Sequence, residues 1–151
     1  YKEPLKTKEA IDDDGFFHTG DLGEIDKDGF LTITGRVKDI FKTSKGKYVS
    51  PVPIEATLEP ELGVEHLCVI GDGLPSPIAI ASIYNKEFQD KEAYHEEAVQ
   101  LIQKINNNLE GHERLSKLVL VNEEWSPENG LITPTLKIRR QRIEQQSLMV
   151  I

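Results

Sequence analysis

The sequence predicts a small α+β fold. Two β-favouring runs flank an Asp28-Gly29 turn, and two later apolar runs, "VEHLCVIGD" and "SPIAIASIY", have the composition of buried strands. Between about residues 90 and 109, the apolar positions instead recur at helical spacing. A hairpin followed by alternating short strands and helices favours a small α+β sandwich.

The first predicted element is the hairpin in "DLGEIDKDGFLTITGR", residues 21–36. The Asp28-Gly29 dipeptide suits the positive φ angles of a tight hairpin turn. A calcium loop is the alternative, because three acidic residues precede Gly29 at roughly the right spacing. The last ligand of such a loop would be an acid at position 35, where the chain has Gly35, so calcium is excluded.

A helix is predicted in "SPVPIEATLEPE". Ser50 is placed to cap this helix, and Pro51 suits its first turn. Ile54 and Leu58 lie four residues apart, on one helical face. Pro60 is expected to end the helix early, because an interior proline removes a backbone hydrogen bond.

The longest predicted helix covers about residues 90–109, and Gly111 supplies its stop. The run "KLVLVNEEW" predicts another strand, and "SPENG" predicts a turn. The run "KIRRQRIEQQ" predicts a final short helix whose N-terminal half is basic. No repeat or low-complexity segment interrupts this order of elements.

The composition is that of a folded globular chain. Of its 151 residues, 38% are hydrophobic and 29% are charged, which suffices for one core and excludes wholesale disorder. No apolar run or leader predicts a membrane span or a secretory signal. The lone Cys68 cannot form an internal disulfide, so a reducing cytoplasm is expected. The chain opens on Tyr1 in loop-like sequence, and we expect it to be a piece of a longer protein.

Charge is segregated along the chain. The formal net charge is −8, yet five of the 18 Lys and Arg residues lie within residues 36–47 and four within 137–142. Asp39 is the one acid in these two segments. Two such segments predict local sites for a polyanion, whereas nucleic-acid binding would show a broader positive face and is not expected. The alternative is that both segments are solvated faces.

Standard catalytic motifs are absent from the sequence. The four histidines are scattered and lack a second histidine or cysteine at metal-ligand spacing, so no metal site is predicted. There is no Gly-x-Ser-x-Gly elbow and no Gly-rich phosphate loop. Hydrolase chemistry and stand-alone nucleoside-triphosphate chemistry are therefore disfavoured.

Four short motifs remain: "HTGD" at 18–21, "GRVKD" at 35–39, "TSKGKYVSPVPIE" at 43–55 and "TPTLKIRR" at 133–140. In this order they resemble the C-terminal signature motifs of the acyl-adenylate-forming superfamily, which includes acyl-CoA synthetases, luciferases and the adenylation domains of peptide synthetases. The stretches "GFFHTGDLGEIDKDGFLTITGR", "VSPVPIE" and "ENGLITPTLKIRR" are most similar to long-chain fatty acyl-CoA synthetases. The resemblance spans nearly the whole chain.

The resemblance implies a domain organisation. Residues 1–35 would be the tail of a large N-terminal AMP-binding domain, including the hairpin, and residues 36–39 would be the hinge. Residues 40–151 would be a mobile C-terminal domain with a short, mainly antiparallel sheet flanked by helices. In the family, the small domain swings over the large one between two half-reactions. The ATP phosphate loop and the acyl tunnel would precede Tyr1, so the chain alone is expected to be inactive or nearly so.

The first two motifs imply nucleotide contacts and a hinge. Asp21 matches the family's carboxylate that accepts hydrogen bonds from both ribose hydroxyls of the adenylate. Arg36 would lie beside the same ribose and phosphate. Lys38 matches the hinge position, and Asp39 is its neighbour. The alternatives are a turn aspartate at position 21 and a solvated pair of opposite charges at the hinge.

The third motif implies a role in thioester formation. Ser44, Lys45, Gly46 and Lys47 match a glycine-bearing loop that faces the large domain in that step and lines the path of the CoA thiol. Many relatives carry two adjacent glycines where this chain has Lys45-Gly46. Gly46 still permits a close backbone approach. Lys45 either reaches a CoA phosphate or points to water.

The fourth motif implies the catalytic residue. Lys137 matches the lysine that enters the active site during adenylation and meets the carboxylate nucleophile and the α-phosphate together. A cation there offsets the repulsion of two anions and stabilises the transition state. Arg139 and Arg140 would support the helix start or contact phosphate. Most relatives outside the long-chain group have Gly before this lysine, whereas this chain has Leu136, which favours the fatty acyl branch.

The implied activity is that of a long-chain fatty acid–CoA ligase. ATP and CoA are its substrates, and Mg²⁺ accompanies ATP, bound mainly by the N-terminal domain. Its partners would be the fatty acid, ATP or AMP, CoA and its own N-terminal domain, with peripheral membrane contact open for the full-length enzyme. Two alternatives stay open: another adenylate-forming enzyme, such as an aryl-CoA ligase or a carrier-loading adenylation domain, and a non-catalytic module that binds a nucleotide or CoA.

Overall fold

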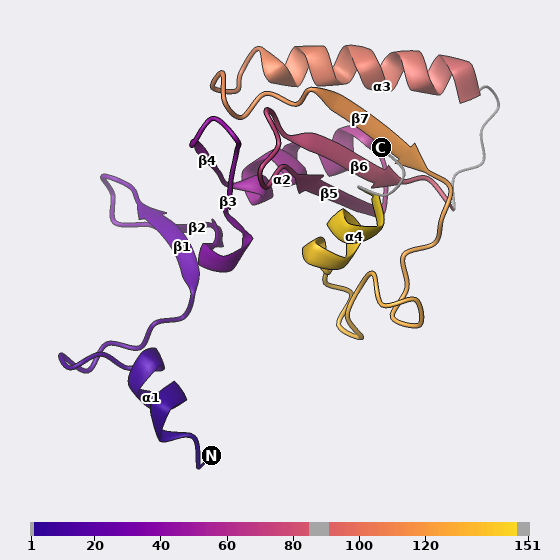
Figure 1. Cartoon of the computed structure of the whole chain (residues 1–151). Helices are drawn as coiled ribbons and strands as arrows, with labels where there is room; N and C mark the ends of the chain where they lie inside the picture. Colours follow the sequence, from indigo (N-terminus) through magenta and orange to yellow (C-terminus); the bar gives the residue numbers. More distant parts are fainter. Residues whose placement is uncertain (1, 85–90, 148–151) are drawn as a thin grey trace.

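The computed structural model describes residues 2–84 and 91–147 and divides into a projecting arm and a body (Figure 1). The arm, residues 2–36, contains helix α1 (Pro4–Ala10) and a hairpin of strands β1 (Asp21–Ile25) and β2 (Leu31–Arg36). A single 3₁₀ turn, Val37–Asp39, joins the arm to the body.

The body comprises the described residues from 40 onward. Its elements are β3 (Phe41–Lys42), β4 (Tyr48–Val49), α2 (Pro51–Leu62), β5 (His66–Ile70), β6 (Ile78–Ser82), α3 (Lys91–Asn106), β7 (Lys117–Val121) and α4 (Arg140–Ser147). Strands β3 and β4 form a small ribbon, and β5, β6 and β7 form a sheet in that order. Only the β6–β7 pairing is parallel among the described strands. The predicted α+β class, with a short, mainly antiparallel sheet flanked by helices, is confirmed.

The β5-β6-β7 sheet is the middle layer of the body, and its side chains alternate between two cores (Figure 1). One face packs with α2 and α3 in a first core that includes Val49, Ile54, Leu58, Leu62, Leu67, Val69, Ala79, Ala81, Ala98 and Ile102. The other face packs with α4 in a second core that includes Cys68, Ile70, Ile78, Ile80, Trp125, Leu131, Ile132 and Ile143. The alternation places β5 and β6 between helices on both sides.

The hairpin forms where it is predicted, but its turn differs from the expected one. Gly29 has φ +86°, whereas Asp28 is not left-handed. The Gly29 N–H donates to the Asp26 carbonyl over 3.0 Å. Asp26 Oδ1 accepts from the N–H groups of Asp28 and Phe30, both at 2.9 Å. The Asp26 side chain therefore closes a longer turn in which only the glycine needs a positive φ.

Helix α2 departs from two expectations. Ser50 precedes the helix without a capping hydrogen bond, and its Oγ instead donates to the Thr34 carbonyl of β2 over 3.3 Å. The helix continues through Pro60 to Leu62 and ends at Gly63, which has φ +58°. Leu62 is buried in the first core, and this burial offsets the hydrogen bond lost at Pro60.

The last two helices begin or end inside the predicted ranges. Helix α3 stops at Asn106, whose side chain donates to the Leu115 carbonyl over 2.9 Å and accepts from the Leu115 N–H over 2.8 Å. Helix α4 begins at Arg140, so Lys137 lies in the turn before it. Among the described residues, no helix is both long and apolar enough to cross a membrane.

Candidate active site

Asp21 and Arg36 lie opposite each other across the hairpin. They are partners in the β1–β2 register and form an ion pair, with Arg36 Nε 2.9 Å from Asp21 Oδ1. The Asp21 N–H donates to Thr19 Oγ1 over 3.1 Å, which orders the start of β1. The Arg36 and Asp21 side chains are 54% and 30% exposed. The structure thus brings the two predicted nucleotide-binding residues together and leaves both accessible to a ligand.

The predicted hinge is one 3₁₀ turn between extended residues. Arg36 has φ −120° and ψ 137°, and Ile40 has φ −65° and ψ 130°. Lys38 is exposed and Asp39 is half-buried. Hinges are commonly a few residues at the ends of regular elements, and this short link has that character. The assignment of Lys38 and Asp39 as the hinge stays a prediction.

Residues 43–47, the Lys45 loop, form the turn between β3 and β4. The Gly46 N–H donates to the Thr43 carbonyl and the Thr43 N–H to the Lys47 carbonyl, both over 2.8 Å. Ser44, Lys45, Gly46 and Lys47 are all exposed. Gly46 has φ +77°, so the turn itself requires a glycine there, whether or not a ligand approaches its backbone.

Residues 133–137, the Lys137 loop, form the turn before α4. The Thr133 N–H donates to the Lys137 carbonyl over 2.7 Å, and the Lys137 N–H donates to Thr133 Oγ1 over 3.1 Å. The loop is closed at its base by a bridge between Ile132 and Ile138. The Lys137 side chain is exposed and has no ion pair within the described chain. Its ammonium group is therefore available to a partner outside this chain.

Arg140, three residues further on, has a different environment. Its guanidinium pairs with both oxygens of the Glu55 carboxylate of α2, Nη1 with Oε1 and Nη2 with Oε2, the latter over 3.0 Å. Arg140 Nη1 also donates to the Val69 carbonyl over 2.6 Å. The Arg140 and Glu55 side chains are 11% and 10% exposed. Of the two expected roles for Arg140, the structure shows support of the helix start.

The buried pair shifts neighbouring pKa values. Burial alone would lower the pKa of Arg140, but the hydrogen bond to Glu55 and nearby charges raise it overall. Burial raises the pKa of the Cys68 thiol to about 12, although Arg140 acts in the opposite direction. Glu55 was not among the predicted site residues. Its position beside the buried Ile54, on the apolar side of α2, is the signal that could have identified it.

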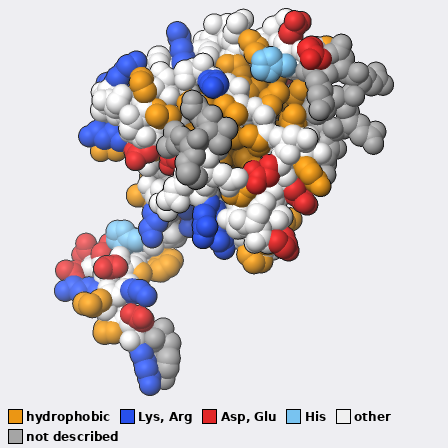
Figure 2. All heavy atoms as spheres, turned by 45° about the vertical axis from the view of Figure 1, so that its right-hand side comes forward, with side chains coloured by type: hydrophobic (Ala, Val, Ile, Leu, Met, Phe, Trp, Pro, Cys, Tyr) orange, Lys and Arg blue, Asp and Glu red, His pale blue; other side chains and the backbone are white. Residues whose placement is uncertain are grey.

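A hollow of about 500 Å³ lies between the hinge and the start of α4. Lys38, Asp39, Arg139 and Arg142 line it. Figure 2 shows Lys and Arg side chains gathered where the arm meets the body. The fold therefore brings the hinge of the first basic segment next to the second basic segment.

Two acidic residues that the sequence prediction did not include, Asp72 and Glu144, also line this hollow. Burial raises the pKa of Glu144, and the backbone N–H groups of Asp72 and Gly71 partly offset this effect. The mixed charges mean that the hollow is not a uniformly positive surface.

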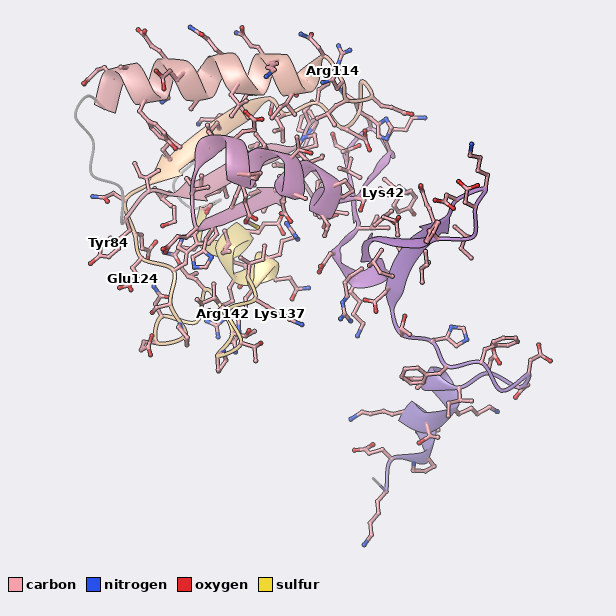
Figure 3. All side chains as sticks on the ribbon, turned by 180° about the vertical axis from the view of Figure 1, so that it is seen from behind. Lys42, Tyr84, Arg114, Glu124, Lys137 and Arg142 are labelled. Carbon is pink, nitrogen blue, oxygen red and sulfur yellow. The ribbon has the colours of Figure 1, made fainter. Side chains whose placement is uncertain are left out.

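The two predicted catalytic loops lie at separate places on the body. Figure 3 shows Lys42, which precedes the Lys45 loop, near the junction with the arm, and Lys137 beside α4 at the lower edge. In Figure 1 the β3–β4 ribbon and the segment before α4 are likewise far apart. The structure does not bring all predicted site residues into one constellation, because the two loops lie at different places on the body.

The acidic, histidine and cysteine side chains do not gather into a metal-binding cluster among the described residues. Within residues 2–84 and 91–147, no group of three or more His, Cys, Asp or Glu side chains could hold a metal ion.

The chain matches the model of one protein family. The family is described as AMP-binding enzyme C-terminal domain, and the match covers residues 38–149. Because this match includes most of the chain, the chain belongs to the AMP-binding enzyme C-terminal domain family.

Several curated relatives are ligases. The chain is 33% identical over 158 residues to long-chain-fatty-acid–CoA ligase 5 of Mus musculus, covering 92% of this chain and 23% of that protein. It is 33% identical over 165 residues to long-chain-fatty-acid–CoA ligase 4 of Saccharomyces cerevisiae, covering 95% of this chain and 24% of that protein. The chain thus spans 23–24% of the length of these two relatives.

Solved structures share the fold. The adenylation domain of a carboxylate reductase from Mycobacterium chelonae superimposes with a TM-score of 0.74 at 22% identity, covering 99% of this chain and 24% of that one. MatB from Rhodopseudomonas palustris with bound ATP superimposes with a TM-score of 0.66 at 26% identity, covering 97% of this chain and 27% of that one. These likenesses support the α+β architecture independently of the family match.

Proposed function

We propose that this chain is the C-terminal part of an ATP-dependent long-chain fatty acid–CoA ligase. In the first half-reaction, a fatty acid carboxylate oxygen attacks the α-phosphorus of ATP, and pyrophosphate leaves to give acyl-AMP. In the second, the CoA thiol attacks the acyl carbonyl, the thiol proton is lost, and AMP leaves. The long-chain ligases among the relatives support this substrate class.

One observation carries the proposal: two loops at separate places on one body, which a single turn joins to the arm. An enzyme with two half-reactions at one site can use such a body by turning it, so that each loop faces the site in its own step. Asp21 and Arg36 lie on the arm side of the hinge and would hold the adenylate in both orientations.

Lys137 would serve the first half-reaction. Its exposed ammonium group has no competing ion pair within the described chain, and its backbone is held by Thr133. A positioned cation between the carboxylate and the α-phosphate lowers the repulsion between two anions and stabilises the charge that develops in the transition state. Magnesium would enter with ATP, held by residues that precede this chain.

The Lys45 loop would serve the second half-reaction. Lys45 and Lys47 are exposed at its tip, where they can meet the phosphates of CoA. The remaining partners follow from this assignment: the fatty acid, ATP or AMP, CoA and the large N-terminal domain. We also expect a cytoplasmic enzyme with peripheral membrane contact, which fractionation of cells expressing the full-length protein checks.

The test separates the two half-reactions in the full-length protein. Lys137→Ala should slow acyl-AMP formation by roughly 10² or more, the scale of losing one aimed transition-state group. Thioester formation from supplied acyl-AMP should change little. Lys45→Ala combined with Lys47→Ala should give the reverse pattern, with a roughly ten-fold slower thioester step.

Lys104→Ala is the matched control, because Lys104 is an exposed lysine of α3, away from both loops. It should leave both half-reactions at the wild-type rate. Equal losses in both steps for Lys137→Ala would remove Lys137 from its assigned role.

A second candidate keeps the same chemistry with another acid. The structural likeness to a carboxylate reductase adenylation domain supports considering it. A screen of fatty, aryl and short acids with the full-length protein, with pyrophosphate release as readout, distinguishes the two. Preference for a long-chain fatty acid supports the first proposal. Preference for an aryl acid, or transfer of the acyl group to a carrier protein in place of CoA, contradicts it.

A further inference from the structure

Four turns of this chain share one hydrogen-bond pattern. They are residues 12–16, 26–30, 43–47 and 133–137. In each, the N–H of the fourth residue donates to the carbonyl of the first, and the N–H of the first donates to the carbonyl of the fifth. A side-chain oxygen of the first residue accepts from the N–H of the fifth. This pattern places the fourth residue in the left-handed region.

The fourth residue is glycine in three of these turns and leucine in the last. Gly15 and Gly29 have φ +86° and Gly46 has φ +77°, while Leu136 has φ +59°. A residue with a Cβ is disfavoured in the left-handed region, roughly ten-fold in population, and glycine is not. The Lys137 loop therefore carries a backbone cost that the chain's three other turns of this kind avoid.

Burial of the leucine within the described chain does not offset this cost. The Leu136 side chain is 67% exposed. Its neighbour Lys137 is exposed too and lies on a loop closed by Thr133 and the Ile132–Ile138 bridge. A strained backbone that presents an apolar side chain to solvent, next to the proposed catalytic group, indicates a contact that forms outside this chain.

We propose that Leu136 is a positioning residue that packs against an apolar wall of the large N-terminal domain and seats the Lys137 loop during adenylation. This inference rests on the proposed function. The leucine side chain is short, whereas the lysine side chain carries its charge at the end of a flexible four-carbon stem and reaches further from the backbone. Leu136 therefore contacts the surface of the large domain at the entrance of the active site, while the Lys137 ammonium group reaches the reacting groups.

The length of the relatives supports this choice of occupant. This chain covers 23% and 24% of the length of two curated ligases, so a protein of their length would have a large further part that could supply an apolar surface for Leu136. The substrate's hydrocarbon is the other apolar partner, and dependence of the effect on acyl chain length distinguishes it from the wall.

The test uses the full-length protein and the separated half-reactions. Leu136→Ala and Leu136→Gly should each slow acyl-AMP formation roughly ten-fold, the scale of one lost apolar contact. The loss should appear in kcat, with KM for ATP and fatty acid unchanged, because both substrates bind the large domain. Thioester formation should keep its rate. Leu136→Met should restore most of the adenylation rate.

The stability of the Leu136 variants distinguishes a positioning role of Leu136 from a role in folding. In the 151-residue chain, Leu136→Gly should leave the unfolding equilibrium constant unchanged or lower it, because the strained backbone is relieved. The matched variant Gly46→Leu places the same side chain in the same kind of turn and should raise that constant roughly ten-fold. A Cβ at position 46 meets only Lys42 Cε, at 3.9 Å, so steric clash does not confuse the comparison.

The outcomes are distinct. A wild-type protein that forms no acyl-AMP overturns the proposed function. An active wild type with unaffected Leu136→Ala and Leu136→Gly variants overturns the role of Leu136 alone. Equal loss in both half-reactions, or a loss that tracks lower stability, assigns Leu136 to folding. A loss that changes with acyl chain length overturns the wall contact in favour of the hydrocarbon.

Discussion

Two arginine–carboxylate pairs, one in the arm and one in the body, contain the same groups in different surroundings. Arg36 meets Asp21 through one contact of 2.9 Å, with side chains 54% and 30% exposed. Arg140 meets Glu55 through two contacts, with side chains 11% and 10% exposed. In the sequence, both arginines belong to basic segments of similar appearance. The degree of burial therefore distinguishes Arg36, which is accessible to a ligand, from Arg140, whose guanidinium is held inside the fold.

The same contrast extends to the apolar side chains of the two regions. In the arm, Phe16, Phe17, Ile25 and Phe30 are between 66% and 73% exposed. In the body, the strand residues of β5 and β6 fill two cores. An arm with no core of its own among its described residues fits the prediction that residues 1–35 belong to a larger domain, while the body meets the requirements of an independent unit.

The largest effect on this comparison is expected from the buried arginine. Arg140→Met should lower the free energy of unfolding of the 151-residue chain by about 3–5 kcal/mol, because the Glu55 carboxylate is left buried without its partner. Arg36→Met is the matched variant in the arm and should cost less than about 1 kcal/mol, as for exposed pairs in general. Urea denaturation of both variants measures the difference. Equal losses would mean that burial does not distinguish the pairs.

The next effect concerns the thiol behind the buried pair. Burial raises the pKa of Cys68 to about 12 from an ordinary value of 9.0. Above pH 9 the unfolded chain releases the thiol proton while the folded chain keeps it, so stability falls as pH rises from 9 to 12. The slope from this group is about 1.4 kcal/mol per pH unit.

Cys68→Ala removes this group and provides the reference. Unfolding free energies of both proteins, measured at intervals between pH 8 and 11, should converge as pH rises. Parallel curves would contradict the raised pKa of the buried thiol.

The smallest effect is expected from the apolar side chains of the arm. Ile33 of β2 is 57% exposed. Ile33→Ser should change the unfolding free energy of the 151-residue chain by no more than about 0.5 kcal/mol, the usual range for surface substitutions. In the full-length protein the same substitution should cost more if residues 1–35 belong to the large domain as predicted, because the rest of that domain would then pack on this surface. Thermal unfolding of both lengths, with and without the substitution, tests the domain assignment.

Local signals in the sequence predicted β5, β6, β7 and α3, but not helix α1 or the β3–β4 ribbon, which lie in segments expected to be loops. Strands β5, β6 and β7 are short apolar runs, and α3 follows a repeated helical spacing, so neighbouring residues contain the information. The end of α2 was predicted wrongly, because the burial of Leu62 depends on strands that come later in the chain. Helix α4 likewise begins later than its basic composition suggested, at the residue that Glu55 holds.

The candidate site could be predicted only in part. Asp21 and Arg36 were expected near one nucleotide, and the hairpin places them in contact. The partner of Arg140 could not be inferred, because Glu55 lies 85 residues away in the sequence. The backbone of Leu136 could not be inferred either. Its residue type is a poor one for the left-handed region, so composition alone predicts another conformation.

Trp125 is the one tryptophan of the chain, and it is 4% exposed in the second core. Its ring stacks on His66 with centroids 6.1 Å apart and planes 7° from parallel. The same core includes Ile143 of α4, the helix that directly follows the Lys137 loop. Indole emission responds to the polarity of its surroundings. The intrinsic fluorescence of Trp125 should therefore report whether α4 is packed against the second core, without an attached dye.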